Sequence, residues 1–367
     1  MNSKINPKRG MILFTVALVL TCLLAFTPDI WATPSCAPAG GTNDTREDGS
    51  GEQPRPFLVR TSGQNNTKLI RGRIGALTGP VEVVNAPNIM LGSNGTVGVN
   101  LLDNMSGLSS GDKGNKWGIW MSGAWTDLEN DLSSTAFDGD LFLYMAGLDY
   151  MFTDKFLVGF AVGLEWSNLD TAYNNGTLDS NGFTVSPYAA YLFNDYLSAD
   201  LIVSYTVLDY EETRSGGSIG GSYNAERFMV STGVNYHYLM DNWNFGAGLG
   251  YMYSNEDVDR FIESNGTVNN ARDTDLGEVR FGGRVGYFFN KFEPYFSAYY
   301  IYDVSMEEII VAPNQEQPDN DRDEVETAIG LNYTPTDSIR CGLEVAHSFA
   351  REDFDSTSVL LNLRWEF

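Results

Sequence analysis

Histidine, cysteine and basic residues are scarce in this chain of 367 residues. It holds two histidines, three cysteines and 23 Lys and Arg residues against 48 Asp and Glu residues, which gives a formal net charge of −25. A chain this acidic lacks the basic face that nucleic acid requires. The two histidines show no Ser/His/acid spacing of the kind a hydrolase uses. We therefore expect no nucleic-acid partner, no cofactor, no metal and no enzymatic activity.

Long hydrophobic runs are also missing after the N-terminus. An apolar run from Met11 to Phe26 follows Lys4, Lys8 and Arg9, and small residues stand near Ala32. A basic start, a short apolar stretch and a small-residue exit are typical of a secretory signal peptide, which we assign to residues 1–32. The alternative is a retained N-terminal anchor, for which the run is short, because a membrane-spanning helix needs about 20 residues.

The residues that follow divide into three parts by composition. Residues 33–98 read as a flexible N-terminal segment, either a linker or a short passenger, because their first half is rich in Gly, Thr, Asn and Pro. Residues 99–112 could supply a short helix, centred on Leu101–Leu108, and a linker. Residues 113–367 form one large β domain. Within the flexible segment, residues 33–65 read as disordered and three short pieces read as β-like: Leu69–Ile74, Val81–Val84 and Thr96–Val99.

From Trp117 to the end the sequence alternates with period two. One face of each segment is apolar or aromatic and the other is small or polar, as in the run from Glu278 to Phe289. Such alternation predicts β-strands. Twelve such segments occur: 116–128, 140–152, 156–167, 182–194, 196–210, 223–239, 243–257, 275–289, 292–307, 323–335, 338–349 and 355–367.

The connections between these segments alternate in length. Very short turns occur at 153–155, 195, 241–242, 291 and 337. The other connections are mostly longer and acidic, at 129–139, 168–181, 211–222, 258–274 and 308–322, and the last, 350–354, is shorter. Short turns at one end and long loops at the other, joining segments of about ten residues, are typical of transmembrane barrels. We therefore predict an all-β fold, a closed up-and-down antiparallel barrel of twelve transmembrane strands, with a short helix in its lumen.

The distribution of aromatic residues favours a membrane barrel over a soluble one. Aromatic residues gather beside the short turns, as at Tyr150, Phe152 and Phe156, where a girdle at the lipid–water interface would lie. Only a closed barrel crosses hydrocarbon with β-structure, because an open edge would leave backbone groups unpaired. The alternative is a soluble all-β protein whose apolar face forms a core. We expect a bacterial outer-membrane location, lipid contact, a monomer, and both barrel ends in the periplasm.

The last segment ends in an alternating apolar series. Leu361, Leu363, Trp365 and Phe367 share one face and finish on a C-terminal aromatic residue. This ending resembles the signal that outer-membrane barrels present to the barrel assembly machinery. We interpret these four residues as an assembly signal.

The region from about Leu101 to Phe367 resembles the C-terminal β-domain of autotransporters, the translocator of type V secretion. The residues that carry the resemblance are the Leu101–Leu108 stretch leading into Lys116–Gly123, the Met145–Tyr150 stretch, and the ending Leu361–Phe367. The resemblance implies a twelve-stranded barrel, a helix threading its lumen and an exported passenger upstream. The chain departs from the family pattern because only about 80 residues separate the predicted signal peptide from the first strand.

Charged residues at inward positions of the segments are candidate functional residues. They could pair with one another and support a lumen helix, or they could line a channel and set its ion preference. Pairing is the favoured interpretation. These predicted lumen charges are Asp149, Glu165, Asp200, Arg227, Glu278, Arg280, Arg284, Arg340, Glu344 and Arg364.

The acidic run Asp319–Glu324 could also suggest calcium, since carboxylates are its preferred ligands. Its spacing lacks the glycine and the terminal acid of an EF-hand loop, so we interpret it as a solvated loop.

Three functions remain open on the sequence alone. The first is an autotransporter-type barrel that translocates or displays its short N-terminal segment. The second is a porin-like channel for small solutes. The third is a structural or adhesive barrel that acts through its acidic loops.

Overall fold

The structure is a computed structural model that describes residues 53–78, 90–91, 97–98 and 116–366, except 307, 310, 312, 313 and 337. The predicted signal peptide, the predicted helix at Leu101–Leu108 and the predicted strand piece Val81–Val84 lie outside these residues. In the described part of the chain, no helix combines the length and the apolar character needed to span a membrane.

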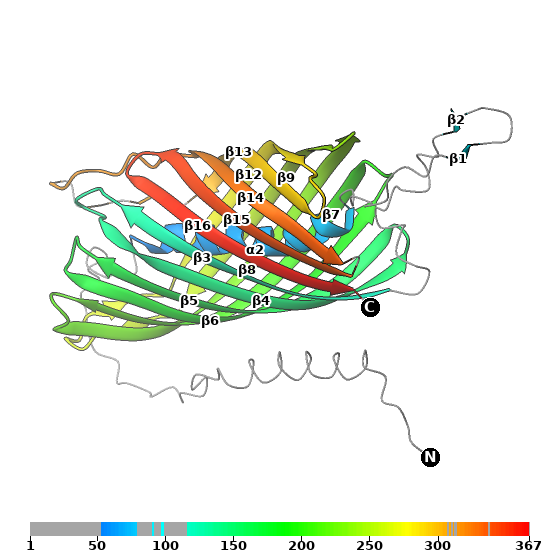
Figure 1. The fold of residues 1–367 in the computed structure, drawn as a ribbon. Helices are drawn as coiled ribbons and strands as arrows, with labels where there is room; N and C mark the ends of the chain where they lie inside the picture. The colour runs from blue at the N-terminus through cyan, green and yellow to red at the C-terminus, as the bar shows by residue number, and fades with distance from the viewer. Residues whose placement is uncertain are drawn as a thin grey trace, which may run out of the picture. The chain divides into compact units, whose positions relative to one another are not determined.

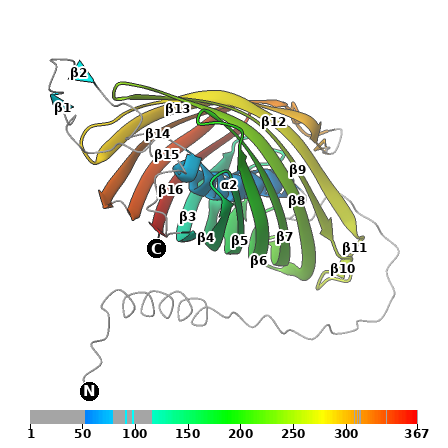
Figure 2. The same ribbon diagram turned by 90° about the vertical axis from the view of Figure 1, so that its right-hand side faces the viewer.

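Twelve strands close into one antiparallel barrel, as predicted (Figure 2). Each strand pairs with its neighbours along the chain, and β16 returns to pair with β3, which closes the ring from Phe354 opposite Asn130 to Glu366 opposite Gly118. The strands are β3 (Trp117–Asn130), β4 (Phe137–Thr153), β5 (Phe156–Thr171), β6 (Gly176–Leu192), β7 (Leu197–Arg214), β8 (Ile219–Met240), β9 (Trp243–Val258), β12 (Arg272–Tyr287), β13 (Phe292–Met306), β14 (Asp323–Thr336), β15 (Ile339–Arg351) and β16 (Phe354–Glu366).

The turns divide the barrel into a short-turn end and a long-loop end. At the short-turn end, β8 and β9 are joined by two residues, of which Asp241 adopts a left-handed backbone conformation (φ 52°). That conformation suits a tight hairpin and is one that Asp tolerates. At the long-loop end, the β9–β12 connection carries a small hairpin of β10 (Phe261–Ile262) and β11 (Val268–Asn269).

Several predicted long loops are wrong, because the strands continue through them. Residues 168–181 contain the last residues of β5 and the first residues of β6, and only four residues join the two strands. Residues 211–222 likewise contain the ends of β7 and β8. The acidic and Asn-rich composition of these stretches suggested loops, but it belongs to one face of extended strands.

The polarity of the barrel wall inverts toward the long-loop end. Along β3, Trp117, Met121 and Trp125 point outward and are exposed, but the next outward residues are Asp127 and Glu129. On the inner face of the same strand, the series passes from Ser122 to fully buried Leu128. The outer face of the wall is therefore apolar in one zone and acidic in the next, which marks where lipid gives way to water.

The inward apolar residues beyond this point form a core inside the barrel. Leu128, Leu141, Leu169, Leu178 and Leu208 are buried together with six further residues of the wall, with Phe261 of β10 and with Leu58. An apolar core of this kind excludes water from the long-loop end of the lumen.

The predicted girdle beside the short turns is present on the outer surface. Phe152, Phe193 and Phe289 are 56%, 52% and 69% exposed, as expected for side chains that face lipid headgroups and acyl chains rather than a protein core. The other aromatic residues exposed in this zone include Phe156, Tyr191, Tyr236, Tyr238, Trp243, Tyr287 and Phe292.

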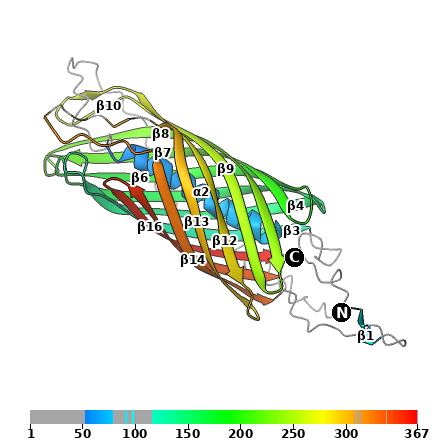
Figure 3. The ribbon, with the colours of Figure 1, turned by 90° about the horizontal axis from the view of Figure 1, so that it is seen from above.

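One helix, α2 (Arg55–Thr78), lies inside the ring of strands (Figures 1 and 3). This corrects two predictions: residues 55–65 are helical rather than disordered, and Leu69–Ile74 is helical rather than β-like. The sequence has no continuous apolar stripe, and a helix that is polar all round is not stable alone in water. It forms here because the barrel wall satisfies its polar side chains. A separate two-residue pairing joins β1 (Met90–Leu91) to β2 (Val97–Gly98), which lies within the predicted Thr96–Val99 piece.

Candidate functional site: the helix-filled lumen

Charge on α2 has a single sign. The helix carries Arg55, Arg60, Lys68, Arg71 and Arg73 and no acidic residue, although the whole chain has a formal charge of −25. Each of these cations pairs with a carboxylate on a different strand of the wall: Arg55 with Glu256 of β9 (3.7 Å), Arg60 with Asp303 of β13, Lys68 with Glu326 of β14, Arg71 with Asp200 of β7 (2.9 Å), and Arg73 with Asp149 of β4. Wall and helix are therefore electrostatically complementary along the length of the helix.

The middle of α2 is held by neutral polar side chains. Ser62 donates to Glu165 and accepts from Arg227 (2.5 Å). Two residues on, Gln64 donates to Glu278 (3.0 Å). Continuing round the helix, Asn65 donates to Thr126 of β3 (2.9 Å), and Asn66 accepts from Ser204 of β7 (3.3 Å). Consecutive residues thus contact strands on all sides of the lumen.

The two ends of α2 pack into two apolar clusters. Near the N-terminus, the ring of Phe57 stacks on Phe354 (4.4 Å between centroids) and contacts Phe137 (5.5 Å), and both partners begin strands at the long-loop end. Toward the C-terminus, Ile70 and Ile74 join the second buried cluster. The helix therefore runs from the long-loop end to the short-turn end. The chain enters α2 at the first of these ends and leaves it at the second.

Half of the predicted lumen charges contact α2. Asp149, Glu165, Asp200, Arg227 and Glu278 are each at most 3% exposed and bind helix side chains. Asp149, Glu165, Asp200 and Arg227 each form an ion pair inside the protein, whereas Glu278 accepts a hydrogen bond from the neutral amide of Gln64.

The other half make contacts within the wall. Arg280 pairs with Glu326 (2.8 Å) and lies over the ring of Tyr299, and Arg284 pairs with Glu293 (3.0 Å). Glu344 accepts a hydrogen bond from Tyr295 (2.6 Å). Arg340 and Arg364 stand opposite each other on β15 and β16.

Other charged residues of the lumen were missed by the sequence reasoning. Asp303, Glu256, Glu324, Glu326 and Arg351 are buried and paired. They lie close to the ends of the strands, where the predicted loops begin, so they were not assigned to the inner face. The sequence does carry a sign of the helix cations that pair with these wall carboxylates. Five cations without one acidic residue between Arg55 and Thr78 are unusual in so acidic a chain.

Three of the four predicted assembly-signal residues lie along one face of β16. Leu361 and Leu363 are 57% and 43% exposed on the outer surface, and Trp365 follows them in register, opposite Ile339 of β15 and Ile119 of β3. Phe367 lies outside the described residues.

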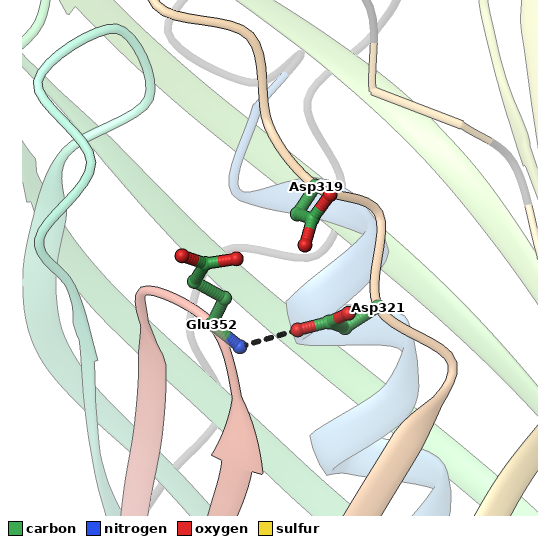
Figure 4. A group of neighbouring side chains, drawn as sticks. All are labelled: Asp319, Asp321 and Glu352. Atoms are coloured by element: carbon green, nitrogen blue, oxygen red, sulfur yellow. Dashed lines mark hydrogen bonds between the residues drawn. The ribbon is translucent and has the colours of Figure 1, made fainter.

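The acidic run Asp319–Glu324 is split between a loop and a strand. Asp319 and Asp321 gather with Glu352 at the long-loop end, each offering an oxygen within 4.8 Å of the others, and the backbone amide of Glu352 donates to Asp321 (2.7 Å; Figure 4). Asp323 and Glu324 belong to β14 and bind Tyr300 and Arg351 instead. The run does not form one chelating loop.

Carboxylates near this group repel one another. The hydrogen bond and charge of Asp319 raise the pKa of Glu352, and Asp353 and Asp321 add to the effect. The pKa of Asp353 is raised by partial burial and then by the charges of Glu316 and Asp131. We refer to residues Asp319, Asp321, Glu352 and Asp353 as the acidic lip.

A closed membrane barrel whose lumen is filled by a helix from its own N-terminal side defines the class of protein. The model of the autotransporter β-domain family matches residues 119–346, which is more than half of the chain, and the chain belongs to this family. The barrel is therefore an autotransporter β-domain located in the bacterial outer membrane, and its outer face contacts the lipids there.

Solved translocator barrels have the same fold. The translocator domain of the autotransporter NalP from Neisseria meningitidis is 11% identical, with a TM-score of 0.61, over 71% of this chain and 91% of that one. The β-domain of the Bordetella autotransporter BrkA is 16% identical (TM-score 0.58; 69% and 100%), and the transport unit of AIDA-I from Escherichia coli is 15% identical (TM-score 0.53; 71% and 93%). No curated protein sequence matches the chain significantly.

Proposed function

We propose that the barrel keeps α2 in its lumen as a plug and holds the chain that precedes Gln53 at the cell surface. The observation that carries this proposal is the direction of α2, which runs from the long-loop end to the short-turn end. In an outer-membrane barrel with short periplasmic turns, the long-loop end faces the exterior. Given cleavage near Ala32, the displayed segment is residues 33–52, and the residues after Thr78 belong to the periplasmic end.

Two features of the lumen support display over solute transport. The cations of α2 are paired with wall carboxylates, and both ends of the helix are embedded in apolar clusters. A porin-like channel needs a water-filled path, whereas this lumen is occupied by side chains from end to end of the helix. We therefore favour display over the porin-like and adhesive functions.

Three further properties belong to this proposal. We propose that the chain catalyses no reaction of its own, that it is inserted by the barrel assembly machinery through the signal on β16, and that it works as a monomer. The last of these is supported by the closed ring, because a barrel leaves no strand edge to pair with a second copy.

Cysteine accessibility tests the display proposal. In a background with Cys36→Ser and Cys341→Ser, Ser50→Cys should react with a membrane-impermeant maleimide on intact cells. Gly79→Cys, the residue after α2, is the matched control and should react only once the outer membrane is permeabilised. The proposal is overturned if Ser50→Cys stays unreactive on intact cells, or if Gly79→Cys reacts there.

A further inference from the structure

Gly63 lies against the barrel wall, next to two methionine side chains. A Cβ on this residue would meet both Sδ and Cε of Met252 at 3.0 Å, and Sδ of Met229 at 3.6 Å. Contacts of 3.0 Å are far tighter than ordinary van der Waals separations, so a larger side chain here requires the methionines to move. Glycine therefore lets the helix pack against β8 and β9 without a shift of the Met252 side chain.

Thr67 completes the same surface one helical turn later. Its hydroxyl lies 3.7 Å from the sulfur of Met252 and 3.8 Å from that of Met229. Residues at positions i and i+4 of a helix share a face. Gly63 and Thr67 thus form a notch in α2 that receives two methionine side chains, and we call this surface the notch.

Both methionines are packed within a buried apolar cluster. Met229 and Met252 are 2% and 3% exposed and belong to the same buried cluster as Ile202 and Leu276. Methionine adapts its shape more easily than other apolar side chains. Here, however, closely packed neighbours limit the space into which either side chain could swing.

Two other glycines of the same helix provide a contrast. A Cβ on Gly72 or Gly75 would have no atom within 4 Å. Glycine in a helix interior costs about 1 kcal/mol relative to alanine. At Gly72 and Gly75 nothing in the packing accounts for glycine, whereas at Gly63 the close approach to the wall does.

We propose that the notch is the positioning element that fixes how far α2 sits in the lumen and thereby keeps the barrel closed. The ion pairs along α2 hold the helix with long, flexible side chains, which can follow a shift along the axis. The contact of Gly63 and Thr67 with Met229 and Met252 depends on the shape of the packed surfaces. It therefore cannot follow a shift of the helix along the barrel axis. This inference rests on the proposed function, since it explains how the plug of a display barrel is held.

Planar-bilayer conductance of the full-length purified barrel is the first measurement. Gly63→Leu should increase the open fraction roughly tenfold or more, because overpacking at the notch displaces the helix. Gly72→Leu adds the same side chain to the same helix and should leave the conductance at the wild-type level. Barrel folding of each variant is checked by its difference in gel migration with and without boiling.

A compensating change separates positioning from general damage. Removing the methionine side chain in Gly63→Leu/Met252→Ala should make room for the leucine and return the open fraction toward the wild-type level. Thr67→Leu gives a second, independent variant at the same notch and should open the barrel in the same direction as Gly63→Leu. If Gly63→Leu does not fold, Thr67→Leu tests the proposal in its place.

The proposal is overturned if either folded notch variant stays as closed as the wild type, or if Met252→Ala fails to reverse the effect of Gly63→Leu. These outcomes are separate from the display test. If Ser50→Cys reacts on intact cells while the notch variants remain closed, the display proposal is retained and the positioning role of the notch is rejected. If Ser50→Cys is unreactive, the display function itself fails.

Discussion

Arg73 of α2 and Asp149 of β4 form a buried ion pair in which two guanidinium nitrogens donate to the two carboxylate oxygens. The pair joins the C-terminal part of the helix to the wall at the short-turn end, and Tyr188 donates to the same carboxylate (3.1 Å). Arg340 and Arg364 lie on neighbouring strands and act on this region with charge of the same sign as Arg73. Asp149 therefore supplies negative charge to a region in which three arginines act on one another.

Removing that carboxylate should loosen the plug. Asp149→Asn leaves a buried arginine without its ionic partner, and such a loss costs about 3–5 kcal/mol. We expect a higher open probability in planar bilayers. Asp138→Asn, the same change at an exposed outward position of the same strand, is the control and should behave as wild type. An unchanged open probability in Asp149→Asn would argue that the ion pair does not secure the helix.

Lysine substitutions at two depths should report where the membrane ends. Leu343 is exposed on the outer face near the middle of β15, whereas Asp127 lies outward beyond Trp125. Leu343→Lys should destabilise the barrel by about 2–4 kcal/mol, and Asp127→Lys by about 0–1 kcal/mol. Urea unfolding of the barrel in lipid vesicles measures both. Equal costs at the two positions would contradict the inversion of wall polarity.

The acidic lip should become more mobile as the pH rises. The pKa values of Glu352 and Asp353 are raised above their ordinary values of 4.5 and 3.8. A raised carboxyl pKa gives stability that is complete below the ordinary value and is lost as the pH rises through the raised one. A spin label at Gln317→Cys, in the background without native cysteines, should gain mobility across this range. Adding Glu352→Gln should flatten the change, and a pH-independent spectrum would count against repulsion at the lip.

The C-terminal aromatic residue should matter for assembly more than for stability. Phe367→Ala is expected to lower the amount of folded barrel in the outer membrane severalfold, while the purified chain still refolds in detergent. Thr357→Ala, on the face of β16 that carries Leu361 and Leu363, is the matched control. Equal amounts of folded Phe367→Ala and wild-type barrel in the outer membrane would contradict the proposed assembly signal.

The twelve strands could be predicted because lipid and lumen impose opposite demands on alternate residues. In the membrane zone, Phe160 must face lipid while neighbouring Ala161 and Gly159 face the interior, so the period of two is visible in sequence. Past Trp166 the outward residues are Asn168 and Asp170, because water replaces lipid there. The alternation continues with its polarity reversed, and in the sequence alone this reversal has the composition of a loop.

The lumen helix could not be located from its own sequence. Its Ser, Gln and Asn side chains and its glycines are those of a flexible linker, and no apolar stripe marks a helical face. What makes Arg55–Thr78 a helix is the surrounding wall, whose carboxylates and hydroxyls lie far away in the sequence. Ser62 and Glu165, which bond directly, are separated by 103 residues. The excess of cations was the one local sign of an acidic partner.

The ion selectivity of the barrel without α2 offers a test of charge complementarity. Deleting residues 55–78 removes five cations and leaves carboxylates such as Asp149, Asp200 and Asp303 facing an empty lumen. Rings of carboxylates favour cations. We therefore expect the open pore to select K⁺ over Cl⁻, as measured by its reversal potential in a salt gradient. An anion-selective pore would contradict the pairing of helix and wall.

The occupied lumen is tested most directly by comparing the single-channel conductance of the full-length barrel with that of the chain lacking residues 55–78. We predict that the full-length barrel stays nearly closed and that the deletion opens a large, steady conductance. A full-length barrel that conducts as steadily and as strongly as the deletion variant would contradict the account, because it would show that α2 does not fill the lumen.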